Sequence, residues 1–174
     1  NLSVGHMKNL MHHRNNPKLK FEKIDICKLK PNNKLFKNTN YVFHFAGIGD
    51  VVPSIENPLK YMMANVYGTV QVLEAARYSK VKKFIYAASA SCYGIPEKFP
   101  TDENCKISPQ YPYALSKFLG EQLVNHWVKV YNMHNTCLRF FNVYGPRSRT
   151  TGAYGAVFGV FLAQKLANKP LTIV

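Results

Sequence analysis

The sequence predicts an α/β protein in which helices flank a parallel sheet. Short apolar segments alternate along the chain with longer segments whose apolar residues recur every three or four positions, as in consecutive strand–helix–strand units. The apolar segments end in small or hydroxyl residues, at Ala46-Gly47 and at Ser89, where a ligand can approach the backbone. With 174 residues, 47% of them hydrophobic, the chain can bury one globular core.

The first 40 residues predict a loop and one strand. Residues 6–18 are polar and basic and are expected to form a loop. Residues 21–26 alternate in polarity and predict a strand that ends in Asp25 and Ile26. Alternatively, Asp25 is the N-cap of a helix over residues 28–37, and the pattern leaves both interpretations open.

The next 40 residues predict a strand, a loop and a long helix. Residues 41–45 form a short apolar strand, in which His44 is expected to be a packed core residue. Residues 51–58 predict a loop, from which Ser54 could reach a substrate. Residues 59–78 predict a helix, because their apolar residues follow helical spacing. These apolar positions are 62, 63, 66, 70, 73 and 76.

The candidate catalytic groups follow one strand and open one helix. An apolar strand that starts at Phe84 and reaches Ser89 is followed, after a loop, by a helix that begins at Pro112. Tyr113 and Lys117 lie four residues apart on that helix, so their side chains share one face. A lysine ammonium beside a phenol favours the phenolate, and a serine hydroxyl can hydrogen-bond the same substrate oxygen. Together these groups could remove a proton from an alcohol while a hydride leaves its carbon.

The order of this motif, rather than the tyrosine–lysine spacing, makes it specific. Tyr78 and Lys82 have the same spacing, but they sit at a helix end with no hydroxyl-tipped strand before them. The pair Tyr113 and Lys117 instead follows an apolar strand, Ser89 and a loop, in that order. Only this second pair is therefore expected to form a site.

The remaining segments continue the alternation of strands and helices. Residues 94–111 are rich in proline and predict a loop. Residues 135–141 predict a strand, and Asn142 at its carboxyl end could hydrogen-bond a substrate phosphate or sugar. Residues 153–168 predict a helix, and residues 171–174 begin a further strand.

These motifs, in this order, resemble the extended short-chain dehydrogenase/reductase family and, within it, the NAD-dependent epimerases and dehydratases of nucleotide sugars. The segments that carry the resemblance are Phe43–Gly47, Asn65–Thr69, Phe84–Lys117 and Arg139–Arg147. The resemblance implies a Rossmann-like, doubly wound parallel sheet, incomplete at both ends, with residues 1–174 forming one partial NAD-binding domain that holds the catalytic core. It also implies a fragment, since the family's Gly-rich turn and most of its substrate-binding part are absent.

The resemblance implies a role for each residue of the site. Ser89, Tyr113 and Lys117 would be catalytic, with NAD as the cofactor and a nucleotide-diphosphate sugar as the substrate. No metal site is expected. Besides Tyr113 and Lys117, the residues expected to contact NAD are Asn1, Asp25, Ile26, Phe45, Ala46, Gly47, Asn65 and Phe141. The residues expected to contact the substrate are Ser89, Ser91, Tyr113 and Asn142.

The residues after Ser89 indicate which reaction the resemblance implies. Dehydratases of the family carry Asp and Glu in the next two positions, where this sequence has Ala90 and Ser91. Decarboxylases carry Glu at the second position, and 3,5-epimerases carry cysteine there. Here Cys92 comes one position later and should point the other way on a strand. We therefore expect a nucleotide-sugar 4-epimerase of the UDP-hexose type.

Alternatives to the 4-epimerase stay open. Within the family they are an NADP(H)-dependent keto-sugar reductase and another sugar-nucleotide dehydratase or decarboxylase. From another class, a basic protein could bind nucleic acid or sense redox state without catalysis, although all three catalytic residues are present. The net charge is +14. Many lysines of residues 1–40 sit beside asparagines without interleaved aromatics, which favours a solvated basic face and no nucleic-acid partner.

Location and assembly follow from weaker signals. No apolar segment approaches the length of a membrane span, and no membrane partner is expected. The four cysteines form no CxxC pair, which favours reduced thiols and a cytoplasmic protein. The resemblance implies a homodimer. An apolar stripe could serve that interface or the internal core; it consists of Leu115, Leu119, Leu123 and Trp127.

Overall fold

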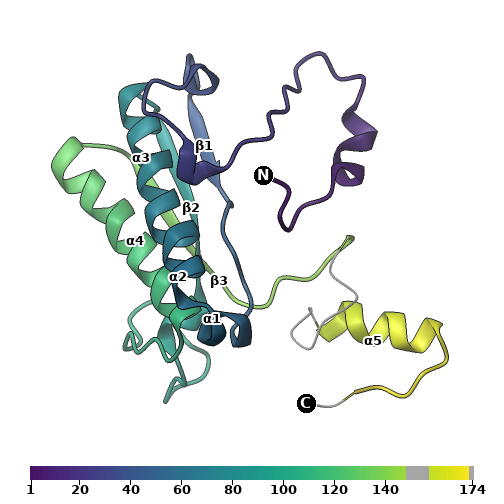
Figure 1. Cartoon of the computed structure of the whole chain (residues 1–174). Coiled ribbons are helices and arrows are strands. Elements are labelled where there is room, and N and C mark those ends of the chain that lie inside the picture. The colour runs from purple at the N-terminus through teal and green to yellow at the C-terminus, as the bar shows by residue number, and fades with distance from the viewer. Residues whose placement is uncertain (148–156, 173–174) are drawn as a thin grey trace. The chain divides into compact units, whose positions relative to one another are not determined.

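The computed structural model of the chain describes residues 1–147 and 157–172 (Figure 1). It divides into two compact units, Asn1–Phe140 and Phe141–Val174. The first unit contains the sheet, the helices that pack on it and the predicted catalytic residues. In the described part of the second unit lies the helix α5 (Val157–Leu166).

The sheet is parallel, as predicted, and the described residues contribute three strands to it. They are β1 (Tyr41–His44), β2 (Lys83–Ser89) and β3 (Asn135–Phe140), with β2 in the centre. Tyr41 pairs with Lys83, and Ser89 pairs with Phe140. Parallel neighbours need a long crossover, and a helix supplies each one: α3 (Gly68–Tyr78) between β1 and β2, and α4 (Pro112–Tyr131) between β2 and β3. The α/β fold class is therefore confirmed.

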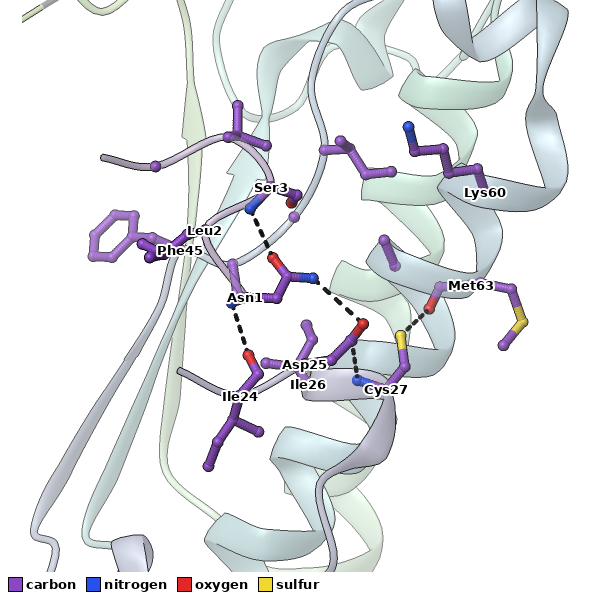
Figure 2. A pocket seen from close by; sticks show the side chains of 16 residues that line it. Asn1, Leu2, Ser3, Ile24, Asp25, Ile26, Cys27, Phe45, Lys60 and Met63 are labelled. Carbon is purple, nitrogen blue, oxygen red and sulfur yellow. Dashed lines mark hydrogen bonds between the residues drawn. The ribbon is translucent and has the colours of Figure 1, made fainter. Parts of the chain in front are cut away.

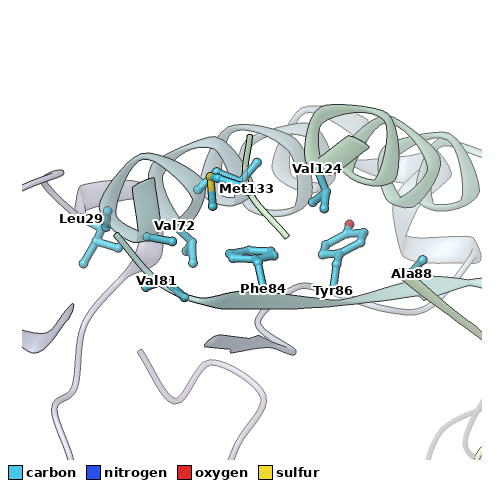
Figure 3. Close-up of a cluster of buried hydrophobic side chains, with 11 residues drawn as sticks. Leu29, Val72, Val81, Phe84, Tyr86, Ala88, Val124 and Met133 are labelled. Atoms are coloured by element: carbon cyan, nitrogen blue, oxygen red, sulfur yellow. The ribbon is translucent and has the colours of Figure 1, made fainter. Parts of the chain in front are cut away.

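Helices α3 and α4 cover one face of the sheet. Alternate residues of β2 are buried, and Figure 3 shows Phe84, Tyr86 and Ala88 pointing from the strand toward the helices. Leu73 of α3 and Val124 of α4 are among the most buried side chains of this core. On the other face of β1, Tyr41 is 61% exposed. The core of the first unit thus lies between the sheet and these two helices.

The long helix predicted over residues 59–78 is confirmed. It runs without a break from α2 (Pro58–Tyr61) through a π-helical segment, Met62–Tyr67, into α3. Pro58 occupies the first turn, where its missing N–H costs no hydrogen bond. A π-helical segment inside a helix is uncommon and often marks a functional position. Here it contains Asn65, one of the predicted cofactor residues.

The strand predicted over residues 21–26 is wrong. Asp25 has extended backbone angles, but residues 21–25 pair with no strand of the described chain, and a 3₁₀ turn follows at Ile26–Lys28. The carbonyl of Ile24 instead accepts a hydrogen bond of 2.8 Å from the amino group of Asn1. A strand requires a neighbour as well as an alternating pattern, and the described residues supply none beside this segment.

The helix predicted over residues 28–37 is also wrong, although Asp25 does cap a turn. Its carboxylate accepts a hydrogen bond of 3.0 Å from the N–H of Cys27 and so caps the short 3₁₀ turn at Ile26–Lys28. A second 3₁₀ turn at Lys34–Phe36 is the other helical piece of this range. Pro31 lies between the two turns and lacks the N–H that a continuous helix would need there.

Two segments predicted as loops, residues 6–18 and 51–58, contain short helices. Met7–His13 is a 3₁₀ helix, and α1 (Val52–Glu56) replaces the loop predicted over residues 51–58. The expectation that Ser54 reaches a substrate is wrong, because this side chain is completely buried. Its hydroxyl accepts a hydrogen bond of 3.1 Å from the N–H of Tyr113. Ser54 therefore satisfies one of the free N–H groups in the first turn of α4.

The predictions for the end of the chain are met in part. The strand predicted over residues 135–141 ends at Phe140. Of the helix predicted over residues 153–168, residues 153–156 lie outside the described part, and the helix ends at Leu166. Leu171 and Thr172 form no strand, and residues 173–174 are outside the described part. Among the described residues, no helix is long and apolar enough to cross a membrane.

Candidate active site

Three hydroxyl groups meet at the carboxyl end of β2. Ser89 is the last residue of the strand, and the Tyr113 hydroxyl donates a hydrogen bond of 3.4 Å to its Oγ. The Oγ of Ser91 lies 2.8 Å from the Oγ of Ser89, and its backbone N–H donates to the same oxygen at 3.2 Å. Ser89 is therefore both a strand end and the cap of the turn Ala90–Tyr93. The predicted meeting of Ser89 and Tyr113 is observed.

The position of Tyr113 is set by buried groups of α1 and α2. Its backbone N–H is held by the hydroxyl of Ser54, and the hydroxyl of Ser54 donates in turn to the carbonyl of Val51. The ring of Tyr61 stands edge-on to the Tyr113 ring, with centroids 6.3 Å apart. The backbone and the ring of Tyr113 are thus held by contacts that do not involve its hydroxyl. The hydroxyl itself contacts Ser89.

Lys117 lies one helical turn after Tyr113, as the spacing predicts. It is buried, and its Nζ lies 4.6 Å from the centroid of the Tyr86 ring. Burial lowers the pKa of the Lys117 ammonium to about 8, because a charge loses solvation in the interior. A side chain at Gly47 would lie 3.8 Å from this ammonium. The Lys117 ammonium therefore lies next to Gly47, which follows β1.

Asn65 holds the loop that follows β1. Its Oδ1 accepts from the N–H of Ile48 at 2.8 Å, and its Nδ2 donates to the carbonyl of Ile48 at 3.0 Å. The same Nδ2 donates to the Oγ of Ser116 at 2.9 Å. A Cβ on Gly47 would approach Oδ1 of Asn65 to 2.9 Å, which is too close for a side chain. Both amide hydrogens of Asn65 are thus committed inside the protein, and its direct contact with a cofactor stays a prediction.

A pocket of about 540 Å³ opens in front of this loop (Figure 2). That volume is within the range of small-molecule and cofactor sites. Six predicted cofactor residues line the pocket, and they are Asn1, Asp25, Ile26, Phe45, Ala46 and Gly47. They come from three separate segments of the chain. The structure therefore gathers in one cavity residues that the sequence analysis had assigned to one ligand.

Asp25 is the acidic group of this pocket. Its carboxylate accepts from the N–H of Cys27 and, at 3.3 Å, from the side-chain amide of Asn1 (Figure 2). The hydrogen bond from Cys27 is the main cause that holds the pKa of the Asp25 carboxyl below its usual value. An ionised carboxylate with further acceptor capacity suits a ligand that offers an amine or hydroxyl donor.

The sequence analysis missed several other residues of the pocket, and three of them lie on one helix. Lys60, Met63 and Ala64 line it from the helix that starts at Pro58. Their spacing of three and four residues places them on one face of that helix, and this was the signal that could have found them. Lys60 contributes the ammonium group of the pocket lining. Cys27 also lines it, and its Sγ donates to the carbonyl of Met63 at 3.3 Å.

Two predicted site residues belong to the second unit. Phe141 and Asn142 follow β3, and both are exposed. Their predicted contacts, with the cofactor and with the substrate, stay predictions. Among the described residues of the chain, no three His, Cys, Asp or Glu side chains gather in a way that could hold a metal ion.

His44 is a core residue, as predicted. It is buried, and its Nε2 lies 2.9 Å from the Oγ1 of Thr69. Thr69 donates its own proton to the carbonyl of Asn65, so Nε2 of His44 must be the donor in this contact. Burial, with a smaller effect of the Lys117 charge, lowers the pKa of His44 to about 3. The imidazole is therefore neutral at physiological pH.

The fold is a parallel α/β sheet with a serine at one strand end and a tyrosine–lysine pair on the next helix. This combination is typical of the short-chain dehydrogenase/reductase class of enzymes. The model of the NAD dependent epimerase/dehydratase family matches residues 2–174. The chain belongs to this family, and the resemblance inferred from its motifs is confirmed. NAD is the cofactor of the family, as its description states.

Named relatives act on nucleotide sugars. The UDP-glucose 4-epimerase of Mycolicibacterium smegmatis is 34% identical over 174 residues, which cover 99% of this chain and 55% of that protein. The UDP-N-acetylglucosamine 4-epimerase of Methanobrevibacter ruminantium, solved with UDP-N-acetylmuramic acid, has a TM-score of 0.90 at 32% identity, covering 97% of this chain and 54% of the other. The UDP-glucuronic acid 4-epimerase of Bacillus cereus, solved with UDP-glucuronic acid and NAD, has a TM-score of 0.85 at 32% identity, with 96% and 52% covered. The chain thus spans about half the length of these relatives.

Proposed function

We propose that the protein is a nucleotide-sugar 4-epimerase of the UDP-hexose type that works through transient oxidation to a 4-keto sugar, with NAD as cofactor. The observation that carries the proposal is the contact of 3.4 Å between the hydroxyls of Tyr113 and Ser89, with Lys117 one turn away. The named relatives support the sugar-nucleotide substrate, since they are 4-epimerases of UDP-sugars.

The chain's own residues would handle the proton of the sugar hydroxyl. Tyr113, as the phenolate, accepts this proton and later returns it, while Ser89 hydrogen-bonds the same sugar oxygen. The ammonium of Lys117 favours the phenolate through its charge. When bound, NAD supplies the hydride acceptor for the sugar carbon and gives the hydride back. Inversion then requires the keto sugar to present its other face before the hydride returns.

The pocket fits the adenosine half of such a cofactor. Asp25 offers a carboxylate acceptor for the exocyclic amine, and Ile26 and Phe45 line the same cavity with apolar surface. Gly47 lacks the side chain that would stand before Lys117, so a ligand in the pocket can extend toward the ammonium. The residues present therefore suit a dinucleotide that enters beside Asp25 and reaches the catalytic groups.

The surroundings of Ser89 support inversion over elimination of water. The turn Ala90–Tyr93 contains no carboxylate. The cysteine of a 3,5-epimerase is not available either, because Cys92 is 1% exposed and cannot reach a sugar. Glu121, on α4, is committed to Arg139 through two hydrogen bonds. A dehydratase needs an acid and a base beside the keto sugar, and these positions do not supply them.

The test uses the full-length protein with UDP-glucose and UDP-N-acetylglucosamine in separate reactions, without added reductant. Products are separated by chromatography, and we expect the 4-epimer of at least one sugar. A dehydrated keto-deoxy product would instead establish a dehydratase. Conversion of a keto sugar with NADPH alone would establish a reductase, and the absence of conversion in every reaction would contradict the enzymatic proposal.

We also propose a cytoplasmic homodimer that associates through α4. Leu115 and Leu119 are 39% and 36% exposed, whereas Leu123 and Trp127 pack against the core. The second half of the apolar stripe therefore belongs to the core, whereas Leu115 and Leu119 form an exposed apolar surface that a second copy could cover. Sedimentation of the full-length protein should give a dimer, and Leu119→Lys should shift it to monomer. The control Lys129→Ala, on an exposed position of the same helix, should leave the dimer intact.

A further inference from the structure

Tyr86 contacts Lys117 at two points. The face of its ring lies 4.6 Å below the ammonium, and its hydroxyl donates a hydrogen bond of 3.4 Å to the Lys117 backbone carbonyl. Tyr86 is completely buried and points from β2 into the layer of α3 and α4 (Figure 3). It stands three residues before Ser89 on the same strand. One rigid side chain thus connects the strand of the serine with the helix of the lysine.

Gly120 makes this arrangement possible. It lies on α4 less than one turn after Lys117, and a Cβ there would collide with the Tyr86 hydroxyl. Without a side chain at this position, the tyrosine can extend under the helix to the Lys117 carbonyl. The contact between Tyr86 and α4 therefore requires a glycine at position 120.

The ring is the electron-rich group that faces the ammonium. In the described part of the chain, the ion pairs recorded do not include Lys117. The Oδ1 of Asn65, which is near Gly47, accepts from the N–H of Ile48, and no hydrogen bond from the Lys117 ammonium to it is recorded among the described residues. The neighbouring imidazole of His44 is neutral and packs against Tyr86 with ring centroids 5.6 Å apart. A buried ammonium with this environment depends on the negative face of an aromatic ring.

We propose that Tyr86 is a positioning residue of the reaction: its ring keeps the Lys117 ammonium charged and fixed beside the catalytic phenol. The proposal rests on the proposed function, in which Lys117 must carry a positive charge. Titratable groups lie near the pair on three of the elements packed there, β1, α4 and β3. They are His44 of β1, Tyr113 and Glu121 of α4, and Cys137 of β3.

Graded fluorination of the ring at position 86 tests the proposal without changing the shape of the core. Fluorine withdraws electron density from the ring face, so it weakens the attraction for an ammonium while the ring still fills the same space. Phenylalanine and its mono-, di- and trifluorinated forms are placed at position 86 of the full-length protein. The same series at Phe84, which is equally buried on β2 but does not face Lys117, is the matched control.

The primary measurement is the pH dependence of Lys117 acetylation by acetic anhydride, followed by mass spectrometry. Tyr86→Phe should leave the labelling midpoint where it is in the unmodified protein, because the ring face is kept. Successive fluorines at position 86 should move the midpoint down, by roughly one pH unit over the series. The series at position 84 should leave it in place. A midpoint that does not move, or that moves equally in both series, would overturn the proposal.

A second measurement separates this proposal from the proposed function. The alkaline limb of kcat against pH should move down with the labelling midpoint, because the reaction needs the charged lysine. Labelling requires no sugar, so it decides the role of Tyr86 even if no epimerisation is found. Conversely, epimerisation with an alkaline limb that does not follow the fluorination series would retain the function and reject the role of Tyr86.

Discussion

Replacing Tyr113 with phenylalanine is expected to lower kcat for epimerisation by between about a hundredfold and ten thousandfold, the range for loss of a general acid–base group. The phenol is the only group of the proposed mechanism that takes and returns the sugar proton. Ser89 lies within 3.4 Å of the phenol, but a neutral serine hydroxyl is a much weaker base than a phenolate. The measurement is kcat of the full-length protein for the sugar that it converts.

The fold should survive this substitution, so the loss can be assigned to chemistry. The backbone N–H of Tyr113 stays bonded to Ser54, and its ring keeps the edge-on contact with Tyr61. The sequence provides a matched control in Tyr78→Phe, since Tyr78 also precedes a lysine by four residues. Tyr78 is 63% exposed and ends α3 just before β2 begins, whereas Ser89 lies at the other end of β2, so activity should be unchanged. Retention of more than a tenth of the activity in Tyr113→Phe would contradict the assigned role.

The positions of Ser89 and Tyr113, the predicted catalytic pair, were predictable because they depend on local geometry. A strand places alternate residues on opposite faces, and a helix returns to the same face after four residues. Ser89 at the end of β2 and Tyr113 at the start of α4 were therefore located correctly from their order in the chain. Asp25 and Gly47, both predicted to contact the cofactor, also line one pocket.

The errors concern features that depend on distant partners. The alternating pattern of residues 21–26 shows which face could be buried, but it does not supply a neighbouring strand. Ser54 was assigned to a loop facing substrate, whereas its partner is the N–H of Tyr113, 59 residues further along. Asn65 has a structural role that no local pattern announced, since its amide hydrogens bond to Ile48 and Ser116, and its cofactor contact stays a prediction. No local pattern contains these pairings.

A second large effect is expected at the ion pair between Glu121 and Arg139. Two hydrogen bonds, of 2.7 and 3.0 Å, join Arg139 on β3 to the buried carboxylate on α4. Arg139 also donates to the hydroxyl of Tyr93 at 2.9 Å and to the carbonyl of Glu103 at 3.3 Å. The pair thus ties together β3, α4 and the turn that follows Ser89. The carboxylate raises the pKa of Arg139, whose guanidinium therefore stays charged.

Glu121→Ala should lower the free energy of unfolding by about 3 kcal/mol, the lower end of the cost of removing one partner from a buried pair. The lower end applies because the Arg139 side chain keeps 21% exposure and retains two other acceptors. Lys98→Ala breaks an ion pair whose lysine is 71% exposed, and should change stability by less than about 1 kcal/mol. Urea unfolding of the full-length protein measures both. Equal losses in the two variants would show that the Glu121–Arg139 pair does not anchor β3 to α4. In that case the pair would not stabilise the turn that contains Ser91 either.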